Sequence, residues 1–222
     1  YAGTFVRESV RSLLPHYEDI LVIHVENVPQ EDDREPRWSE TLEGRVLWIP
    51  AAMDPMTSRG GMFLEQRAAL ERHALPYLQH APVIHCHVGA PTGAALVPLV
   101  PDATRLMITE HATYLKKVLA DPLGRDLYEA AVRRADVFTA VSTRTAWMIE
   151  AAFPEARDHV TVIANPVPLG SLPTKRDLTA AMSRWLYVGN LTEHKGVRRL
   201  VRSFAQWMEY SRDPHARLTL AG

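Results

Sequence analysis

The stretch 185–222 constrains the fold of this chain more than any other, because it contains the pattern of one complete crossover. It begins with four apolar residues, 185–188, and the run breaks at Gly189 and Asn190. Strand character returns at 218–221, after apolar residues that recur at helical spacing and predict one helix face: Val197, Leu200, Val201, Phe204 and Met208. Since parallel strands need a crossover connection, the pattern predicts one βαβ unit of a parallel sheet.

The start of the predicted helix carries charge of an unfavourable sign. His194 and Lys195 lie in or beside its first turn, where the helix dipole makes a cation unfavourable by roughly 0.3–1 kcal/mol. An anion bound at the turn would remove this cost and use the free backbone N–H groups. The alternative is a solvent-exposed lysine near Glu193.

Composition limits the class of protein. Hydrophobic residues make up 46% of the 222 residues, which is enough for a normal buried core. The net charge of −1 gives no general attraction to nucleic acid or membranes. Cys86 is the single cysteine, which excludes an intramolecular disulfide and suits a reducing compartment. With no signal peptide and no apolar stretch long enough for a bilayer, the sequence predicts a soluble, cytoplasmic α/β protein.

Strand and helix patterns alternate along the rest of the chain. Short apolar runs predict strands at 20–23, 45–49, 83–87, 105–109, 137–141 and 160–163. Helical spacing predicts helices at 5–14, 63–78, 113–119, 123–134 and 143–152, with exposed loops at 27–44 and 51–61. This alternation predicts an α/β fold of doubly wound parallel sheets.

A proline-rich stretch without periodicity, 165–179, predicts a linker between two domains. We assign residues 1–165 to an N-terminal Rossmann-like domain and 166–184 to the interdomain linker. Residues 185–222 then form the start of a C-terminal Rossmann-like domain that is truncated.

Polar residues gather where the predicted strands end. His87, His111, Ser142, Asn165 and Asn190 each lie at or just after such an end. Ligands of open parallel sheets bind beyond the carboxyl ends of the strands. These residues are therefore candidates for lining a ligand cleft.

The histidines allow several interpretations. His85 and His87 alternate on one strand and point to one face, so with His111 they suggest a metal site, a cleft-lining role or structural packing. No acidic residue nearby has clear ligand spacing, which disfavours the metal. Glu110 and His111 close an otherwise apolar strand and are predicted to face the cleft. A histidine at this position can hydrogen-bond a sugar hydroxyl, accept the proton of that hydroxyl, or contact a phosphate. The alternative is a histidine in a loop that hydrogen-bonds only to the backbone.

Ser142 and Gly3 are weaker candidates. Ser142 lacks the Gly-x-Ser-x-Gly turn of a hydrolase nucleophile, so we predict that it caps the helix at 143–152. Gly3 precedes the first helix and would let backbone N–H groups approach a phosphate, although a plain turn explains it equally well.

Six stretches, in this order, resemble the family-4 glycosyltransferases of GT-B fold. They are AGTFVRE at 2–8, IHCH at 84–87, TEH at 109–111, ADVFTAVS at 135–142, VIANPV at 162–167 and VGNLTEHKGV at 188–197. Enzymes of this family are retaining and use nucleotide-sugar donors. The resemblance implies two Rossmann-like domains across a cleft, with the acceptor bound mainly by the first and the donor by the second.

The resemblance also implies roles for single residues. Lys195 matches the lysine that holds the donor diphosphate, beside Gly189 and Asn190. Gly3 matches a glycine turn that approaches the same phosphates. His111 matches the strand-end histidine near the reacting sugar and is the predicted catalytic residue.

The remaining matches lie on the acceptor side. Asn165 matches an asparagine at the domain crossover. Together with His87, Ser142 and Glu110 it is predicted to line the cleft.

Two features depart from the family's pattern. Asn190 stands where an arginine usually binds phosphate, so a hydrogen bond is kept but the charge and the bidentate fork are lost. The family's Glu-x7-Glu motif would lie beyond Gly222, and the first strand would precede Gly3. We therefore expect the chain, which begins at Tyr1, to be an internal fragment of a longer enzyme.

The predicted reaction is sugar transfer from a nucleotide-diphosphate sugar to a hydroxyl acceptor with retention at the anomeric carbon. We expect no cofactor and no metal, since Lys195 and helix-terminal N–H groups would stabilise the leaving diphosphate and no Asp-x-Asp motif is present. The expected acceptor is a glycan, a lipid-linked glycan or a small molecule, and nucleic acid is not an expected partner. The expected location is cytoplasmic, with peripheral association at the inner membrane face as an option.

Two other functions stay open at this point. One is a catalytically inactive GT-B module that binds a nucleotide or a partner protein. The other is a sugar-nucleotide epimerase on the same fold, which would need carboxylate acid/base groups that the sequence does not place.

Overall fold

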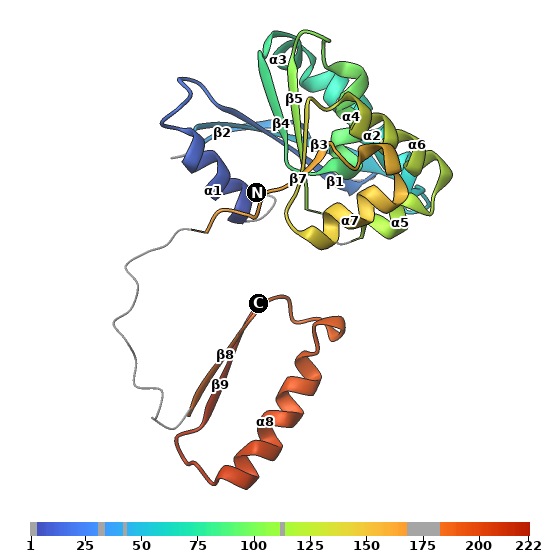
Figure 1. Ribbon diagram of the computed structural model, residues 1–222. Helices are drawn as coiled ribbons and strands as arrows, with labels where there is room; N and C mark the ends of the chain where they lie inside the picture. The colour runs from blue at the N-terminus through green and yellow to red at the C-terminus, as the bar shows by residue number, and fades with distance from the viewer. Residues whose placement is uncertain (1–3, 31–33, 42–43, 112–113, 168–182) are drawn as a thin grey trace. The chain divides into compact units, whose positions relative to one another are not determined.

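The computed structural model of the chain describes residues 4–30, 34–41, 44–111, 114–167 and 183–222 (Figure 1). The chain divides into two compact units, residues 1–168 and 169–222. Both contain parallel strands connected through helices, which confirms the predicted α/β class. Most of the predicted linker falls outside the described residues. Within the described ranges, no helix is long and apolar enough to cross a membrane.

A four-stranded parallel sheet forms the centre of the first unit. Its strands are β4 (Val83–Cys86), β5 (Arg105–Glu110), β6 (Val137–Ala140) and β7 (Val160–Val162), in the order β4-β5-β6-β7. All four were predicted, because strands buried on both faces have continuous apolar runs. Their carboxyl ends share one edge, which places the residues that follow β4 and β5 next to each other (Figure 1).

A three-stranded sheet of order β1-β3-β2 completes the strands of this unit. β1 (Leu21–Pro29) and β3 (Gly44–Met53) are parallel, and β2 (Arg37–Thr41) runs antiparallel to β3. The prediction of a loop at 27–44 was therefore wrong, and β3 also extends into the predicted loop at 51–61. β2 escaped detection because it is an edge strand whose residues are mostly exposed and polar.

Helices and short helical turns connect the strands. They are α1 (Thr4–Leu13), α2 (Arg59–His73), α3 (Leu75–His80), η1 (Gly89–Gly93), α4 (Ala94–Leu96), η2 (Val97–Leu99), α5 (Leu115–Leu119), α6 (Pro122–Arg134), α7 (Thr143–Ala152) and η3 (Pro154–Ala156). The single helix predicted at 63–78 is in fact α2 and α3. They separate at Ala74, whose backbone is not helical, and Pro76 then occupies the first turn of α3, where proline is favoured.

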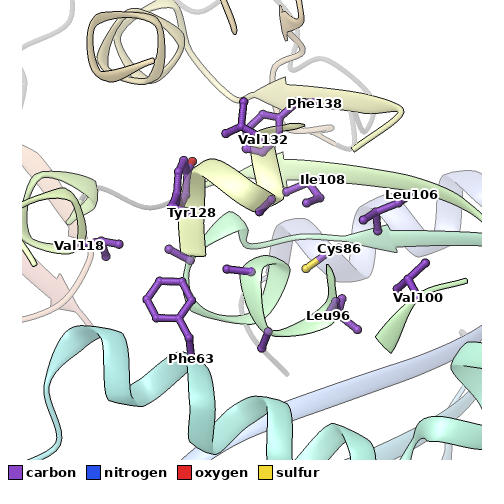
Figure 2. Close-up of a cluster of buried hydrophobic side chains, with 14 of the residues drawn as sticks. Phe63, Cys86, Leu96, Val100, Leu106, Ile108, Val118, Tyr128, Val132 and Phe138 are labelled. Atoms are coloured by element: carbon purple, nitrogen blue, oxygen red, sulfur yellow. The ribbon is translucent and has the colours of Figure 1, made fainter. Parts of the chain in front are cut away.

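The core of the first unit lies between the four-stranded sheet and its covering helices. Figure 2 shows Ile108 of β5 and Phe138 of β6 near Tyr128 of α6, with Phe63 of α2 beside them. Tyr128 and Ile108 have no exposed surface, and the two phenylalanine side chains are almost fully buried. Burial of aromatic and branched side chains stabilises the fold by roughly 1.5–3 kcal/mol each, so this packing fixes the sheet edge that carries the polar residues.

The second unit confirms the predicted βαβ crossover. β8 (Arg184–Val188) pairs in parallel with β9 (Arg217–Ala221), and the turn η4 (Glu193–Lys195) leads into α8 (Val197–Ser211). α8 packs Phe204 and Trp207 against Trp185 of β8, with ring centroids 6.4 and 5.6 Å away.

The apolar face of α8 differs in part from the predicted one. Val201 and Met208 were assigned to it but are more than two-fifths exposed. Trp207, which the prediction omitted, takes the inner position three residues after Phe204.

Candidate functional site

Three histidines gather at the carboxyl ends of β4 and β5. The rings of His85 and His87 lie with centroids 4.0 Å apart. Nδ1 of His87 is 3.4 Å from Nε2 of His111, a distance that allows a weak hydrogen bond. We call His85, His87 and His111 the histidine cluster. Two of them, His87 and His111, are site residues that the sequence predicted, and the parallel register of β4 and β5 brings them together.

Two threonines hold the deepest histidine. Nε2 of His85 is 2.8 Å from Oγ1 of Thr109, and Oγ1 of Thr139 donates to the same Thr109 oxygen over 2.8 Å. Thr109 and Thr139 are register partners on β5 and β6. The Thr109 hydroxyl can donate to His85 Nε2 or accept from it, and in either case the contact fixes the orientation of the His85 ring.

Burial keeps the histidine cluster neutral. It lowers the pKa of His85 to about 3, helped by the neighbouring His87 and His111. It lowers the pKa of His111 to about 4 and also depresses the pKa of His87. At pH 7 all three rings are therefore uncharged imidazoles. Neutral rings suit hydrogen bonds to hydroxyl groups rather than neutralisation of a phosphate, and the lowered pKa values make these rings weak bases.

His111 has one ring nitrogen ready for a further partner. The ring of Phe5 stacks on it, with centroids 4.1 Å apart and planes 19° from parallel. Its Nδ1 is buried and has no hydrogen-bond partner among the described residues. A buried, unpaired polar atom costs about 1–3 kcal/mol, and such an atom at a strand end points to a ligand contact.

The other predicted residues of the first unit have separate positions. Ser142 caps α7, as predicted, by accepting a 3.2 Å hydrogen bond from the Thr145 amide. Asn165 is half-buried beyond the end of β7. Gly3 lies outside the described residues.

Glu110 lies in the interior, although the sequence predicted a cleft-lining position. It has no exposed surface, and Tyr128 Oη donates to its Oε2 over 2.7 Å. A methyl group at Gly89 would lie 2.5 Å from the same oxygen. A side chain at position 89 therefore has no room beside this carboxylate.

The turn after β8 presents the predicted donor-side residues of the second unit. The amide of Gly189 donates to the Ala221 carbonyl at the end of β9 over 2.9 Å. The Asn190 carbonyl accepts a 3.0 Å hydrogen bond from Tyr187 Oη. These contacts hold the turn at the sheet end, while the Asn190 side chain is left exposed.

Lys195 lies just before α8 rather than inside its first turn. It ends η4, and Gly196 then takes a left-handed conformation with φ of 74° before the helix begins. The exposed arginines Arg198, Arg199 and Arg202 line a hollow of about 240 Å³ with Glu193 and Gly196. This excess of positive charge at a helix N-terminus favours an anion.

Comparison with known proteins identifies the family. The model of Glycosyltransferase Family 4 matches residues 2–171. The chain belongs to Glycosyltransferase Family 4. No curated protein matches it. A solved structure of sucrose-phosphate synthase from Thermosynechococcus elongatus is similar, with 12% identity over 76% of this chain and 86% of that chain and a TM-score of 0.48.

The part of this family 4 glycosyltransferase that matches the family includes the histidine cluster, whereas the turn at 189–196 lies beyond it. Within the described residues, no three His, Cys, Asp or Glu side chains are arranged to hold a metal ion.

Sequence reasoning missed three residues that support the histidine cluster. Thr109 and Thr139 appear in quoted motifs but received no role, because their pairing depends on strand register. Phe5 was predicted only as the start of the helix at 5–14. The available signal for Thr109 was its position two residues before His111, near the end of the strand that His111 follows.

Proposed function

We propose that this family 4 glycosyltransferase moves a sugar from a nucleotide-diphosphate sugar to a hydroxyl acceptor with retention at the anomeric carbon. The observation that carries the proposal is the neutral histidine cluster with the unpaired Nδ1 of His111. Family membership supports sugar transfer itself. Retention and the nucleotide-sugar donor come from the resemblance of the sequence motifs.

His111 is the proposed catalytic residue. As a neutral imidazole it can accept a hydrogen bond from a hydroxyl of the reacting sugar or the acceptor, and proton transfer to it requires that the bound substrates raise its pKa from about 4. Phe5 and His87 fix the plane and one nitrogen of its ring. His87, Ser142 and Asn165 are proposed acceptor-side residues, while the buried Glu110 supports the loop beside them.

Lys195 is the proposed ligand of the donor diphosphate. Charge accumulates on the diphosphate as the sugar leaves, and a preorganised cation with backbone N–H groups stabilises it. The turn at Gly189 and Asn190 lies at the same sheet end, and Gly3 is proposed to approach the same phosphates. The arginines of α8 supply the positive charge that Asn190 lacks.

These cations support transfer without a metal or other cofactor, which we propose for this enzyme. The proposed acceptor is a glycan, a lipid-linked glycan or a small molecule with a free hydroxyl. We also propose a cytoplasmic location, with peripheral association at the inner membrane face when the acceptor is lipid-linked.

The test uses the full-length protein and a panel of UDP-, GDP- and ADP-sugars. Donor affinity is measured by calorimetry, transfer by product formation, and retention by NMR of the new anomeric centre. Lys195→Ala should weaken donor binding by about tenfold or more, whereas Lys117→Ala, at an exposed lysine of α5, should not. His111→Ala should lower kcat by roughly 10²–10⁴ while donor binding persists.

Two results would overturn the proposal. Lys195→Ala with unchanged binding and transfer would remove the donor assignment. Nucleotide binding without any transfer by the full-length protein would favour the inactive binding module. Transfer that persists in EDTA supports metal independence, and its complete loss with recovery on adding a divalent cation would contradict it.

A further inference from the structure

A hollow with two aromatic walls lies at the outer strand of the three-stranded sheet. It has a volume of about 390 Å³ and is lined by Trp38, Ser39, Glu40, Arg45 and Tyr77. Its residues come from β2, from the start of β3 and from α3. None belongs to the histidine cluster, and Arg45 lies at the amino end of β3, whereas ligands of parallel sheets normally bind at the carboxyl end.

The two aromatic rings form a corner. Trp38 and Tyr77 lie with centroids 5.6 Å apart and planes 74° from parallel, so each ring stands across the other. Trp38 is 49% exposed and Tyr77 is 40% exposed. Tryptophan and tyrosine side chains normally bury most of their surface by packing. Here two neighbouring rings each keep nearly half of their surface exposed to solvent.

Strand register places polar groups beside this corner. Trp38 and Glu40 are two residues apart and therefore point to one face of β2. Arg45 is the register partner of Glu40 on β3 and shares that face. The Arg45 guanidinium also bonds to Asp19 over 3.0 Å, although half of its side chain stays exposed.

The chemistry of the lining selects the ligand. Glu40 and Arg45 are the charged residues of the lining, and Asp19 also bonds to Arg45, so the hollow has no excess of positive charge to attract phosphates and nucleotides. Glu40 and Arg45 offer acceptors and donors for neighbouring hydroxyl groups, and the aromatic faces offer apolar contact. A pyranose ring has this combination of hydroxyl edge and C–H face, and pockets that combine apolar walls with a few polar groups are typical ligand sites.

We propose that the hollow is an accessory saccharide site that binds one or more units of a neutral glycan. Trp38 and Tyr77 contact the C–H faces of the sugar, while Glu40 and Arg45 hydrogen-bond its hydroxyl groups. The residues of this site are separate from Lys195, and the proposal does not depend on the donor chemistry proposed for that lysine. It would hold a glycan to the enzyme at a place apart from the histidine cluster.

The experiment measures binding of neutral gluco-, galacto- and manno-oligosaccharides, two to six units long, to the full-length protein. Saturation-transfer NMR identifies a binding oligosaccharide, and isothermal titration calorimetry gives its Kd in wild type and in every variant. Trp38→Ala and Tyr77→Ala should each raise the Kd by about tenfold or more. Trp38→Phe keeps an aromatic face and should raise it less.

Matched controls separate this site from the catalytic one. Trp147→Ala removes another exposed tryptophan, on α7, and should leave the Kd within twofold of wild type. Lys195→Ala should bind the oligosaccharide normally even where it loses the donor. Trp38→Ala should keep its donor affinity, and circular dichroism shows whether each variant is folded.

Three outcomes would overturn the proposal. One is that no neutral oligosaccharide in the panel binds. Another is that a bound oligosaccharide keeps its wild-type Kd in folded Trp38→Ala and Tyr77→Ala. The third is that a nucleotide, and not a neutral sugar, protects Trp38 from quenching.

Discussion

Burial at the sheet end makes His85 a neutral structural support for the two histidines nearer the surface. Its hydrogen bond to Thr109 and the ring of His87 leave little room for a solvated charge. Protonation of His85 is therefore linked to unfolding, since the unfolded chain offers water to the imidazolium.

We predict that this linkage makes the protein less stable in acid. The pKa of His85 falls from 6.5 in the unfolded chain to about 3 in the folded one. The unfolded state thus binds the extra proton below pH 6.5, so stability is full above that pH and falls as pH decreases towards 3. At about 1.4 kcal/mol per pH unit, His85 accounts for roughly 2 kcal/mol of lost stability at pH 5.

Urea unfolding at pH 7.5 and pH 5 measures this effect. His85→Gln keeps a partner for Thr109 but has no proton to gain, so it should lose about 2 kcal/mol less than wild type over the same interval. Equal losses in both proteins would contradict the assigned role of His85.

Single-residue roles were only partly predictable. His87 and His111 could be found because they follow apolar runs that end at one sheet edge. The position of Glu110 could not, because its burial depends on Tyr128, which arrives from α6 eighteen positions later. A carboxylate next to a site histidine has the same sequence signature whether it faces solvent or the core.

The elements were predicted best where their patterns were regular. α7 lies at 143–152, as expected, because Ser142 gives it a clear start. The strands β4 to β7 were found from their apolar runs. β2 was missed because an edge strand needs few apolar residues, and the break between α2 and α3 was missed because the apolar spacing continues across it.

The turn before α8 gives a prediction about one element. Gly196 has φ of 74°, and an added methyl group would meet nothing within 4 Å. The cost of Gly196→Ala is therefore purely conformational, about 1–2 kcal/mol. Gly196→Asn should cost clearly less, because asparagine tolerates this conformation better than alanine.

Hydrogen exchange followed by mass spectrometry is the measurement for this change. In Gly196→Ala the amides of α8 should exchange roughly 5- to 30-fold faster wherever exchange requires opening of this crossover, while those of α6 stay as in wild type. Faster exchange in Gly196→Asn than in Gly196→Ala would show that the left-handed backbone at residue 196 does not determine the cost of substitution there.

At the scale of the whole molecule, charge is distributed unevenly. Residues 1–168 contain 16 Lys and Arg against 22 Asp and Glu, whereas residues 169–222 contain 9 against 4. The net charge of the chain is therefore close to zero because an acidic first unit and a basic second unit offset each other. The basic unit carries Lys195 and the arginines of α8, the groups proposed to meet the donor diphosphate.

We predict that nucleotide binding depends on salt and that saccharide binding does not. Exposed charges are screened as the Debye length shortens, so raising NaCl from about 50 to 500 mM should weaken UDP binding by roughly three- to tenfold. The hollow at Trp38 should change its oligosaccharide Kd by less than about twofold. Calorimetric titrations at both salt concentrations test the two predictions. A nucleotide Kd that stays the same at both concentrations would show that the phosphate binds away from these cations.

The stacking of Phe5 on His111 has a consequence for synthesis on the ribosome. Phe5 of α1 is made before β5, whereas the His111 ring that it stacks on follows β5. At translation rates of about 5–20 residues per second, Phe5 waits roughly 5–20 s for its partner. This stacking contact therefore cannot form until β5 has been made, which places it among the late contacts in the assembly of the first unit.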